Sequence, residues 1–398
     1  MHRRTLAGIV TGLTLATTAG CGGADVGADP GLGKDHGAVE GAREVAEPQL
    51  HLTTIDADGA VAQLDLLEES PTEIGTIGAP GAVESDGRYL FATTAEGVEI
   101  VDSGMWTWDH GDHFHYYRGE PTLVGTVTGD GDATVATGPL STAGSTGVFF
   151  RDSGEAVLLH NEALADGEVR ELFRIDAGSH DGLVAPIGDG ALVTVADGGA
   201  ITVIRYHDAD GKAVGEETPC ARASGTIATK VGVVVGCADG AVLATETDGR
   251  IGYERIPYPS EAPRATRFDG RKNRPTVAAL SGKSGIWLLD TRERSWTHLD
   301  AGTSLHQVVA VDDEEGHVLA LDTTGRVRVF AAEDGKQLAV TEPLGTSESA
   351  EIQLDQDRAY LNDPAKGVVH EIAYADEARI ARTLETPTVP EFFAETGR

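Results

Sequence analysis

Basic side chains are scarce in this chain of 398 residues. Lysine and arginine together number 31, against 64 aspartates and glutamates, so the formal net charge is −33. A surface this acidic repels nucleic acid and anionic lipid, and it disfavours phosphate-rich ligands. The composition therefore excludes nucleic-acid binding from the candidate functions and suits a protein that binds cations.

Long apolar runs are missing beyond the first twenty residues, so no later segment predicts a membrane span. Residues 2–4 are basic, residues 6–19 are mostly apolar, and the small residues at 18–20 precede Cys21. This order is typical of a lipoprotein signal peptide. We predict that residues 1–20 are removed and that Cys21 carries a lipid. The protein would then be exported and attached to the extracytoplasmic face of the cell membrane by that lipid alone.

Apolar periodicity is absent from the next segment, which is rich in glycine, alanine and acidic residues. Such a composition buries too little surface to offset the entropy of the chain. We therefore predict a flexible tether over residues 21–48. Residues 49–398 remain for the folded domain, which we expect to be a monomer.

Cysteine is also rare, with three residues in the chain. If Cys21 carries lipid, Cys220 and Cys237 remain as a pair in an oxidising compartment, where a disulfide is the expected state. A pair of thiolate ligands for a metal is the alternative.

Helical periodicity is almost absent, and short runs of β-branched residues alternate with Asp-Gly turns instead. A similar sequence pattern recurs at residues 190–206, 231–247 and 315–331. A unit of about 40–50 residues with four short strands is typical of a β-propeller. A β-sandwich lacks a fixed repeat of this length. The predicted units start near Gly81, Ala133, His180, Gly225, Arg264, His306 and Ser349.

The two ends of the domain hold incomplete units. Residues 50–78 contain about three predicted strands and residues 387–394 contain one, so together they form one blade and close the ring. We predict an all-β fold, a β-propeller of eight blades, with seven blades as the alternative.

The segment 105–118, MWTWDHGDHFHYYR, interrupts one unit with three histidines in six positions. Neutral imidazoles bind Zn²⁺, and a carboxylate can ligate as well or fix the tautomer of a ligating histidine. We expect a metal site here, formed by His110, His113, His115 and Asp112. The alternatives are a polar loop whose histidines contact solvent and a catalytic His–Asp pair.

The histidine loop inside a propeller repeat, the exported start and the paired cysteines resemble AztD-type periplasmic zinc metallochaperones. The resemblance implies a protein that is not an enzyme, binds Zn²⁺ and passes it to the solute-binding protein of a zinc ABC importer.

The chain departs from the family pattern at two places. No histidine closely follows Cys220, and the tether offers only His36, whose part in metal binding is open. We expect His180, at the start of a first strand, to supply the missing ligand from the channel of the propeller. Two other functions stay open: a metal-dependent propeller hydrolase or lyase, and a propeller scaffold that binds another exported protein.

Overall fold

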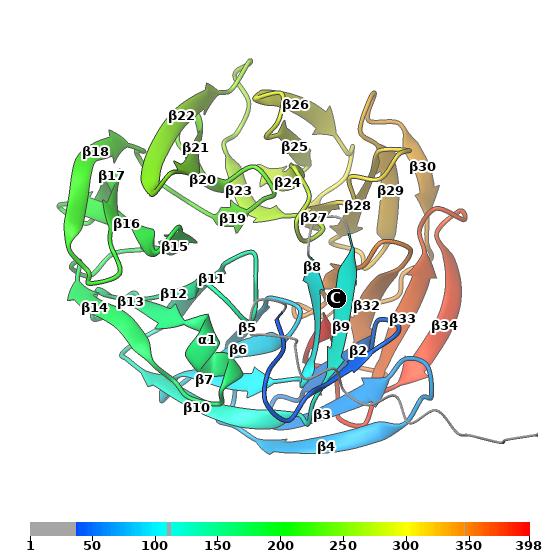
Figure 1. Ribbon diagram of the computed structural model, residues 1–398. Helices are drawn as coiled ribbons and strands as arrows, with labels where there is room; N and C mark the ends of the chain where they lie inside the picture. The colour runs from blue at the N-terminus through cyan, green and yellow to red at the C-terminus, as the bar shows by residue number, and fades with distance from the viewer. Residues whose placement is uncertain (1–36, 110–112, 346) are drawn as a thin grey trace, which may run out of the picture.

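Eight four-stranded antiparallel sheets stand around a common axis in the computed structural model (Figure 1). The structure describes residues 37–109, 113–345 and 347–398. Seven of the sheets take their strands from one stretch of the chain, and the eighth combines β35 with β2, β3 and β4. The chain is thus an eight-bladed β-propeller, which confirms the predicted fold and rules out seven blades. We number the blades along the chain from the one that contains β2.

Each blade runs from an innermost strand near the axis to an outermost strand at the rim. From blade 1 to blade 8, the innermost strands are β35 (Phe392–Thr396), β5 (Ala82–Ser85), β11 (Ala133–Thr137), β15 (Val184–Ile187), β19 (Thr226–Ala228), β23 (Ala265–Asp269), β27 (Leu305–Ala310) and β31 (Ile352–Leu354). The second strands are β2 (His51–Ile55), β6 (Tyr89–Thr94), β12 (Ser145–Phe150), β16 (Gly190–Asp197), β20 (Val233–Cys237), β24 (Thr276–Ser281), β28 (His317–Asp322) and β32 (Ala359–Asp363).

The outer half of each blade is more exposed. The third strands are β3 (Ala60–Asp65), β7 (Gly97–Asp102), β13 (Glu155–His160), β17 (Ala200–His207), β21 (Gly240–Thr247), β25 (Gly285–Asp290), β29 (Val327–Ala331) and β33 (Val368–Ala373). The outermost strands are β4 (Pro71–Thr76), β10 (Thr122–Thr128), β14 (Glu171–Asp176), β18 (Ala213–Pro219), β22 (Arg250–Pro257), β26 (Ser295–Asp300), β30 (Gln337–Val340) and β34 (Arg379–Glu385). A short helix, α1 (Asn161–Ala165), follows β13, and no helix in the described part of the chain is long and apolar enough to cross a membrane.

Two features of the sequence produce the blades. The second strands are buried on both sides, as in β6, so apolar residues from neighbouring blades pack together and the core is a series of seams between blades. The turns use acidic side chains, as where Oδ1 of Asp56 accepts hydrogen bonds from the backbone N–H groups of Asp58 and Ala60. Gly59 completes this turn at φ +92°, a conformation that favours glycine.

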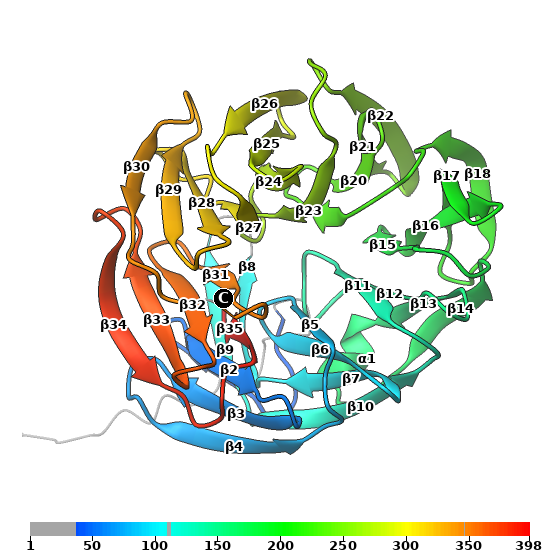
Figure 2. The same ribbon diagram turned by 180° about the vertical axis from the view of Figure 1, so that it is seen from behind.

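The ring is closed by strands from the two ends of the domain. Strand β35 pairs with β2 from His51↔Thr396 to Ile55↔Phe392, and the two are neighbours in Figure 2. The hydroxyl groups of Thr53 and Thr396 are 3.1 Å apart across this pair. The shared blade confirms the predicted closure, and it pairs the edge of β2 that faces the axis.

A small three-stranded sheet lies outside the eight blades. It contains β1 (Arg43–Val45), β9 (Phe114–Arg118) and β8 (Met105–Asp109), in the order β1-β9-β8. The sequence placed residues 43–45 in the flexible tether, and their strand was not anticipated because three residues, two of them charged, are too few to show an apolar pattern. The predicted signal peptide and Cys21 lie outside the described residues and stay predictions.

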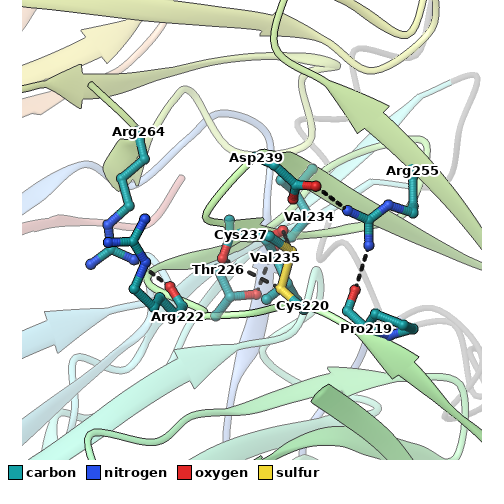
Figure 3. The surroundings of a disulfide bond; sticks show 11 residues. Pro219, Cys220, Arg222, Thr226, Val234, Val235, Cys237, Asp239, Arg255 and Arg264 are labelled. Atoms are coloured by element: carbon teal, nitrogen blue, oxygen red, sulfur yellow. Dashed lines mark hydrogen bonds and ion pairs between the residues drawn. A yellow bond between two sulfur atoms is a disulfide. The ribbon is translucent and has the colours of Figure 1, made fainter. Parts of the chain in front are cut away.

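Cys220 and Cys237 form a disulfide (Figure 3), so the predicted pairing is present. Cys220 directly follows the outermost strand of blade 4, and Cys237 ends the second strand of blade 5. Both side chains are buried, at 0% and 1% exposure. Close by, Arg255 donates to the carbonyl oxygen of Pro219 at 2.7 Å. The bond therefore joins two neighbouring blades, and it removes both cysteines as thiolate ligands.

Replacing Cys220 and Cys237 with alanine should lower the free energy of unfolding by about 3 kcal/mol, because the disulfide closes a loop with a sequence separation of 17. Denaturant unfolding of the wild type and the double variant, each with and without reductant, measures this. Reductant should bring the wild type to the level of the variant and leave the variant unchanged. Equal stability of the oxidised wild type and the variant would contradict a stabilising role.

Candidate metal centre

The histidine segment folds as the hairpin β8–β9, inserted between the third and outermost strands of blade 2. Aromatic packing fixes its base: Trp106 is 2% exposed and stacks on Tyr117 with ring centroids 5.2 Å apart. The guanidinium of Arg88 lies 3.9 Å from the centroid of the Trp106 ring and pairs with Asp102 at 2.7 Å. These contacts hold the hairpin against blade 2.

Segments near both ends of the described chain also support the hairpin. The indole N–H of Trp106 donates to the carbonyl oxygen of Gly37 at 3.0 Å. The hydroxyl of Thr107 donates to the carbonyl oxygen of Gly397 at 2.7 Å. Strand β1 pairs with β9 along the other edge. The hairpin is thus assembled from three parts of the chain that are far apart in sequence.

The hairpin lies on the face of the ring where the innermost strands end. Gly397, which Thr107 contacts, directly follows the innermost strand β35. Because successive strands of a blade are antiparallel, a connection from the third to the outermost strand emerges on that same face. The hairpin is in front of the ring in Figure 1 and behind it in Figure 2.

Two of the predicted ligands face each other at the tip of the hairpin. Nε2 of His113 lies 2.9 Å from Nε2 of His115, and Nδ1 of His115 lies 2.7 Å from Oε1 of Glu44 on β1. The side chain of His115 is 13% exposed. His110 and Asp112 lie outside the described residues, so their predicted roles stay predictions.

This geometry fits a tetrahedral zinc ion. Two nitrogen ligands at about 2.0–2.1 Å from Zn²⁺ stand about 3.3 Å apart. The observed 2.9 Å between the two Nε2 atoms is a few tenths of an ångström shorter, so the two nitrogens lie close to the spacing of a ligand pair. A carboxylate on the second nitrogen of a ligating histidine is a common support in zinc sites.

His180 has a different setting from the one predicted. It precedes the innermost strand β15, and connections into an innermost strand lie on the face opposite the hairpin. Its Nδ1 is 2.7 Å from the carbonyl oxygen of Gly178, and its Nε2 is 2.8 Å from the hydroxyl of Thr194. The ring packs on Phe149. Both nitrogens are hydrogen-bonded within blades 3 and 4, so the structure does not bring His180 to the hairpin.

A second group of metal-ligand types lies in the connection between β27 and β28. Asp313, Glu315 and His317 each offer an atom within 4.8 Å of the others. Asp313 accepts from both the backbone N–H and the Nδ1 of His317, at 2.8 and 2.6 Å. In blade 1, Asp56 accepts the equivalent hydrogen bond from the backbone N–H four residues later, and the residue at that position is Ala60 and not a histidine. The contacts are therefore those of a turn, and sequence reasoning overlooked the group because it treated His317 as isolated.

A cavity of about 430 Å³ follows the axis of the ring, and five acidic residues line it, of which Glu84, Asp269 and Glu351 have raised pKa values. Removal from water, followed by the charges of neighbouring carboxylates, raises the pKa of Glu84 to about 7 and that of Glu351 to about 8, against the opposing effect of Arg267. Removal from water also raises the pKa of Asp269. Sequence reasoning did not single out these residues, because an acidic residue in or beside an innermost strand has the same sequence pattern as one that faces solvent.

These carboxylates should make the protein less stable as the pH rises. Their pKa values are higher in the folded protein than in the unfolded chain, so the folded state binds more protons between about pH 5 and 8. The resulting stabilisation is complete below about pH 5 and is lost as the pH rises through this range. Glu84 is exposed on β5, so solvent screens it, and we expect about 1 kcal/mol from each residue rather than the full linkage energy. The substitutions Glu84→Gln and Glu351→Gln should flatten the pH dependence of the unfolding free energy.

Chemical denaturation at pH 5, 7 and 9 measures this effect. Glu73→Gln is the matched control, since Glu73 is exposed on the outermost strand β4. A pH profile of either channel variant that coincides with the wild-type profile would contradict the assigned pKa values.

Comparison with known proteins supports the fold. No protein-family model matches the sequence. The crystal structure of AztD from Citrobacter koseri is 18% identical, with a TM-score of 0.75 over 88% of this chain and 98% of that chain. The apo AztD structure from the same organism is 16% identical, with a TM-score of 0.74 over 88% of this chain and 100% of that chain.

A more distant likeness is to the dihydro-heme d1 dehydrogenase NirN in complex with DHE, which is 14% identical. It has a TM-score of 0.56 over 89% of this chain and 77% of that chain. At these levels of identity the comparisons establish the architecture. The chain thus has the propeller fold of AztD over nearly the whole length of that protein.

Proposed function

We propose that this protein is an extracytoplasmic zinc metallochaperone. It binds one Zn²⁺ at the tip of the β8–β9 hairpin and passes it to the solute-binding protein of a zinc ABC importer. The observation that carries the proposal is the pair of Nε2 atoms 2.9 Å apart, with the other nitrogen of His115 held by a carboxylate. The AztD fold and the family resemblance of the histidine loop support it. His110 and Asp112 are proposed to complete the ligand set.

The hairpin suits transient binding better than catalysis. Its ligands lie at the exposed end of an inserted hairpin, whereas the base is buried against blade 2. The two cysteines of the described chain are joined in a disulfide, so this part offers no thiolate nucleophile. We further propose that the lipid at Cys21 keeps the protein at the membrane, close to the importer. A metal ion bound here is cargo for transfer.

Replacing both His113 and His115 with alanine should abolish tight binding of one zinc per chain. The fold should remain intact, and the stability of the metal-free protein should change by less than about 0.5 kcal/mol, because the substituted side chains lie at the tip of the hairpin. Isothermal titration with Zn²⁺ and metal analysis of the purified protein measure binding, and circular dichroism checks the fold.

His180→Ala and His317→Ala are the matched controls, since each removes one histidine outside the hairpin. Both should retain one zinc per chain, and His180→Ala should lower stability because it removes two buried hydrogen bonds. If the double variant binds one zinc with unchanged affinity, the hairpin is not the site.

Transfer is tested by mixing the zinc-loaded protein with the metal-free solute-binding protein of a zinc ABC importer. Direct transfer should be faster than the loss of zinc to an excess of a small chelator, because the acceptor takes the ion within a complex. Equal rates in the two experiments would mean that the ion passes through solution.

A further inference from the structure

The strand that brings a carboxylate to His115 comes from the N-terminal segment. Strand β1 pairs antiparallel with β9, with Glu44 opposite Tyr117. His115 is two residues from Tyr117 on the same strand, so its side chain lies on the same face of the sheet and diagonally across from Glu44. Backbone pairing therefore determines the 2.7 Å contact between Oε1 of Glu44 and Nδ1 of His115.

We propose that Glu44 is the positioning residue of the zinc site, holding His115 in the tautomer that presents an Nε2 lone pair to the metal. The proposal rests on the proposed function. A carboxylate accepts but does not donate, so Nδ1 of His115 carries the proton in this contact. The Nε2 of a neutral His115 is then an acceptor, and it is this atom that faces His113. Glu44 does not itself touch the ion.

The proton balance in the metal-free hairpin follows from the same contacts. With His115 as the acceptor, His113 donates its Nε2–H across the 2.9 Å contact. When zinc binds, that proton moves to the other ring nitrogen of His113 by exchange with water, and both Nε2 lone pairs point at the ion. His115 thus needs no change of tautomer, and only His113 rearranges.

The same segment encloses the base of the hairpin. Gly37, at φ +74°, lies so close to Trp108 that a Cβ there would meet the ring at 2.5 Å. Its carbonyl oxygen accepts the indole N–H of Trp106. Residues 37–45 therefore contact both strands of the hairpin. Displacement of β1 would take Glu44 away from His115.

Three substitutions distinguish a positioning role of Glu44 from a general effect on the stability of the protein. Glu44→Ala removes the acceptor, Glu44→Gln keeps an acceptor oxygen without the charge, and Glu40→Gln removes a charge at an exposed position of the same segment. In the metal-free protein, nitrogen NMR of His115 should show the proton on Nδ1 in the wild type, Glu44→Gln and Glu40→Gln. In Glu44→Ala it should move to Nε2, the site that an imidazole without this partner prefers.

Zinc titration is the second readout. The dissociation constant should rise by about 10-fold to 100-fold in Glu44→Ala, by less in Glu44→Gln, and not at all in Glu40→Gln. An unchanged tautomer in Glu44→Ala, or an equal loss of affinity in Glu40→Gln, overturns the positioning role. If the wild type binds no zinc, the proposed function fails, while the tautomer measurement still tests the contact between Glu44 and His115.

Discussion

Closure of the ring by β35 and β2 is the constraint on which the rest of the structure depends. Each blade buries its faces against two neighbours, so a propeller with an open seam exposes the apolar sides of its first and last blades. The pairing that runs from His51↔Thr396 to Ile55↔Phe392 closes the seam, so the apolar sides of the first and last blades are covered. It also fixes where the two ends of the described chain lie, because residues just before β2 and just after β35 must emerge beside blade 1.

The candidate site is a product of that closure. Blade 2 carries the hairpin, and its neighbour blade 1 delivers Gly397 from one end of the chain and the segment 37–45 from the other. Thr107 and Trp106 bond to these two segments. A hairpin inserted in a blade far from the seam would lack both supports. The position of the insertion, next to the closing blade, therefore decides how well its histidines are ordered.

The sequence predicted the parts of the structure that repeat. Asp-Gly turns and short apolar runs recur in most units, so the strands, the eight blades and the shared blade could be derived, and Cys220 and Cys237 were paired correctly. The structure does not bring the predicted ligand His180 to the hairpin, because the start of an innermost strand and the hairpin belong to opposite faces of the ring. Successive strand connections lie on alternate faces of the ring. Counting the connections would have placed His180 and the hairpin on opposite faces.

Other features had no signal in the sequence. Glu44 lies in a three-residue strand whose pairing partner is about 70 residues away, and no local pattern marks such a pair. The channel carboxylates Glu84, Asp269 and Glu351 come from three blades, and their proximity depends on the radius of the closed ring. Long-range placement, rather than local preference, is what the sequence alone left undetermined.

The disulfide stands on the far side of the ring from the closing pair. It links blades 4 and 5, about half a circle from blade 1, so the two connections divide the propeller into arcs of similar length. The arc that carries the hairpin is bounded at one end by hydrogen bonds and at the other by a covalent bond. A reductant therefore acts on one boundary of this arc and leaves the other, which consists of hydrogen bonds, in place.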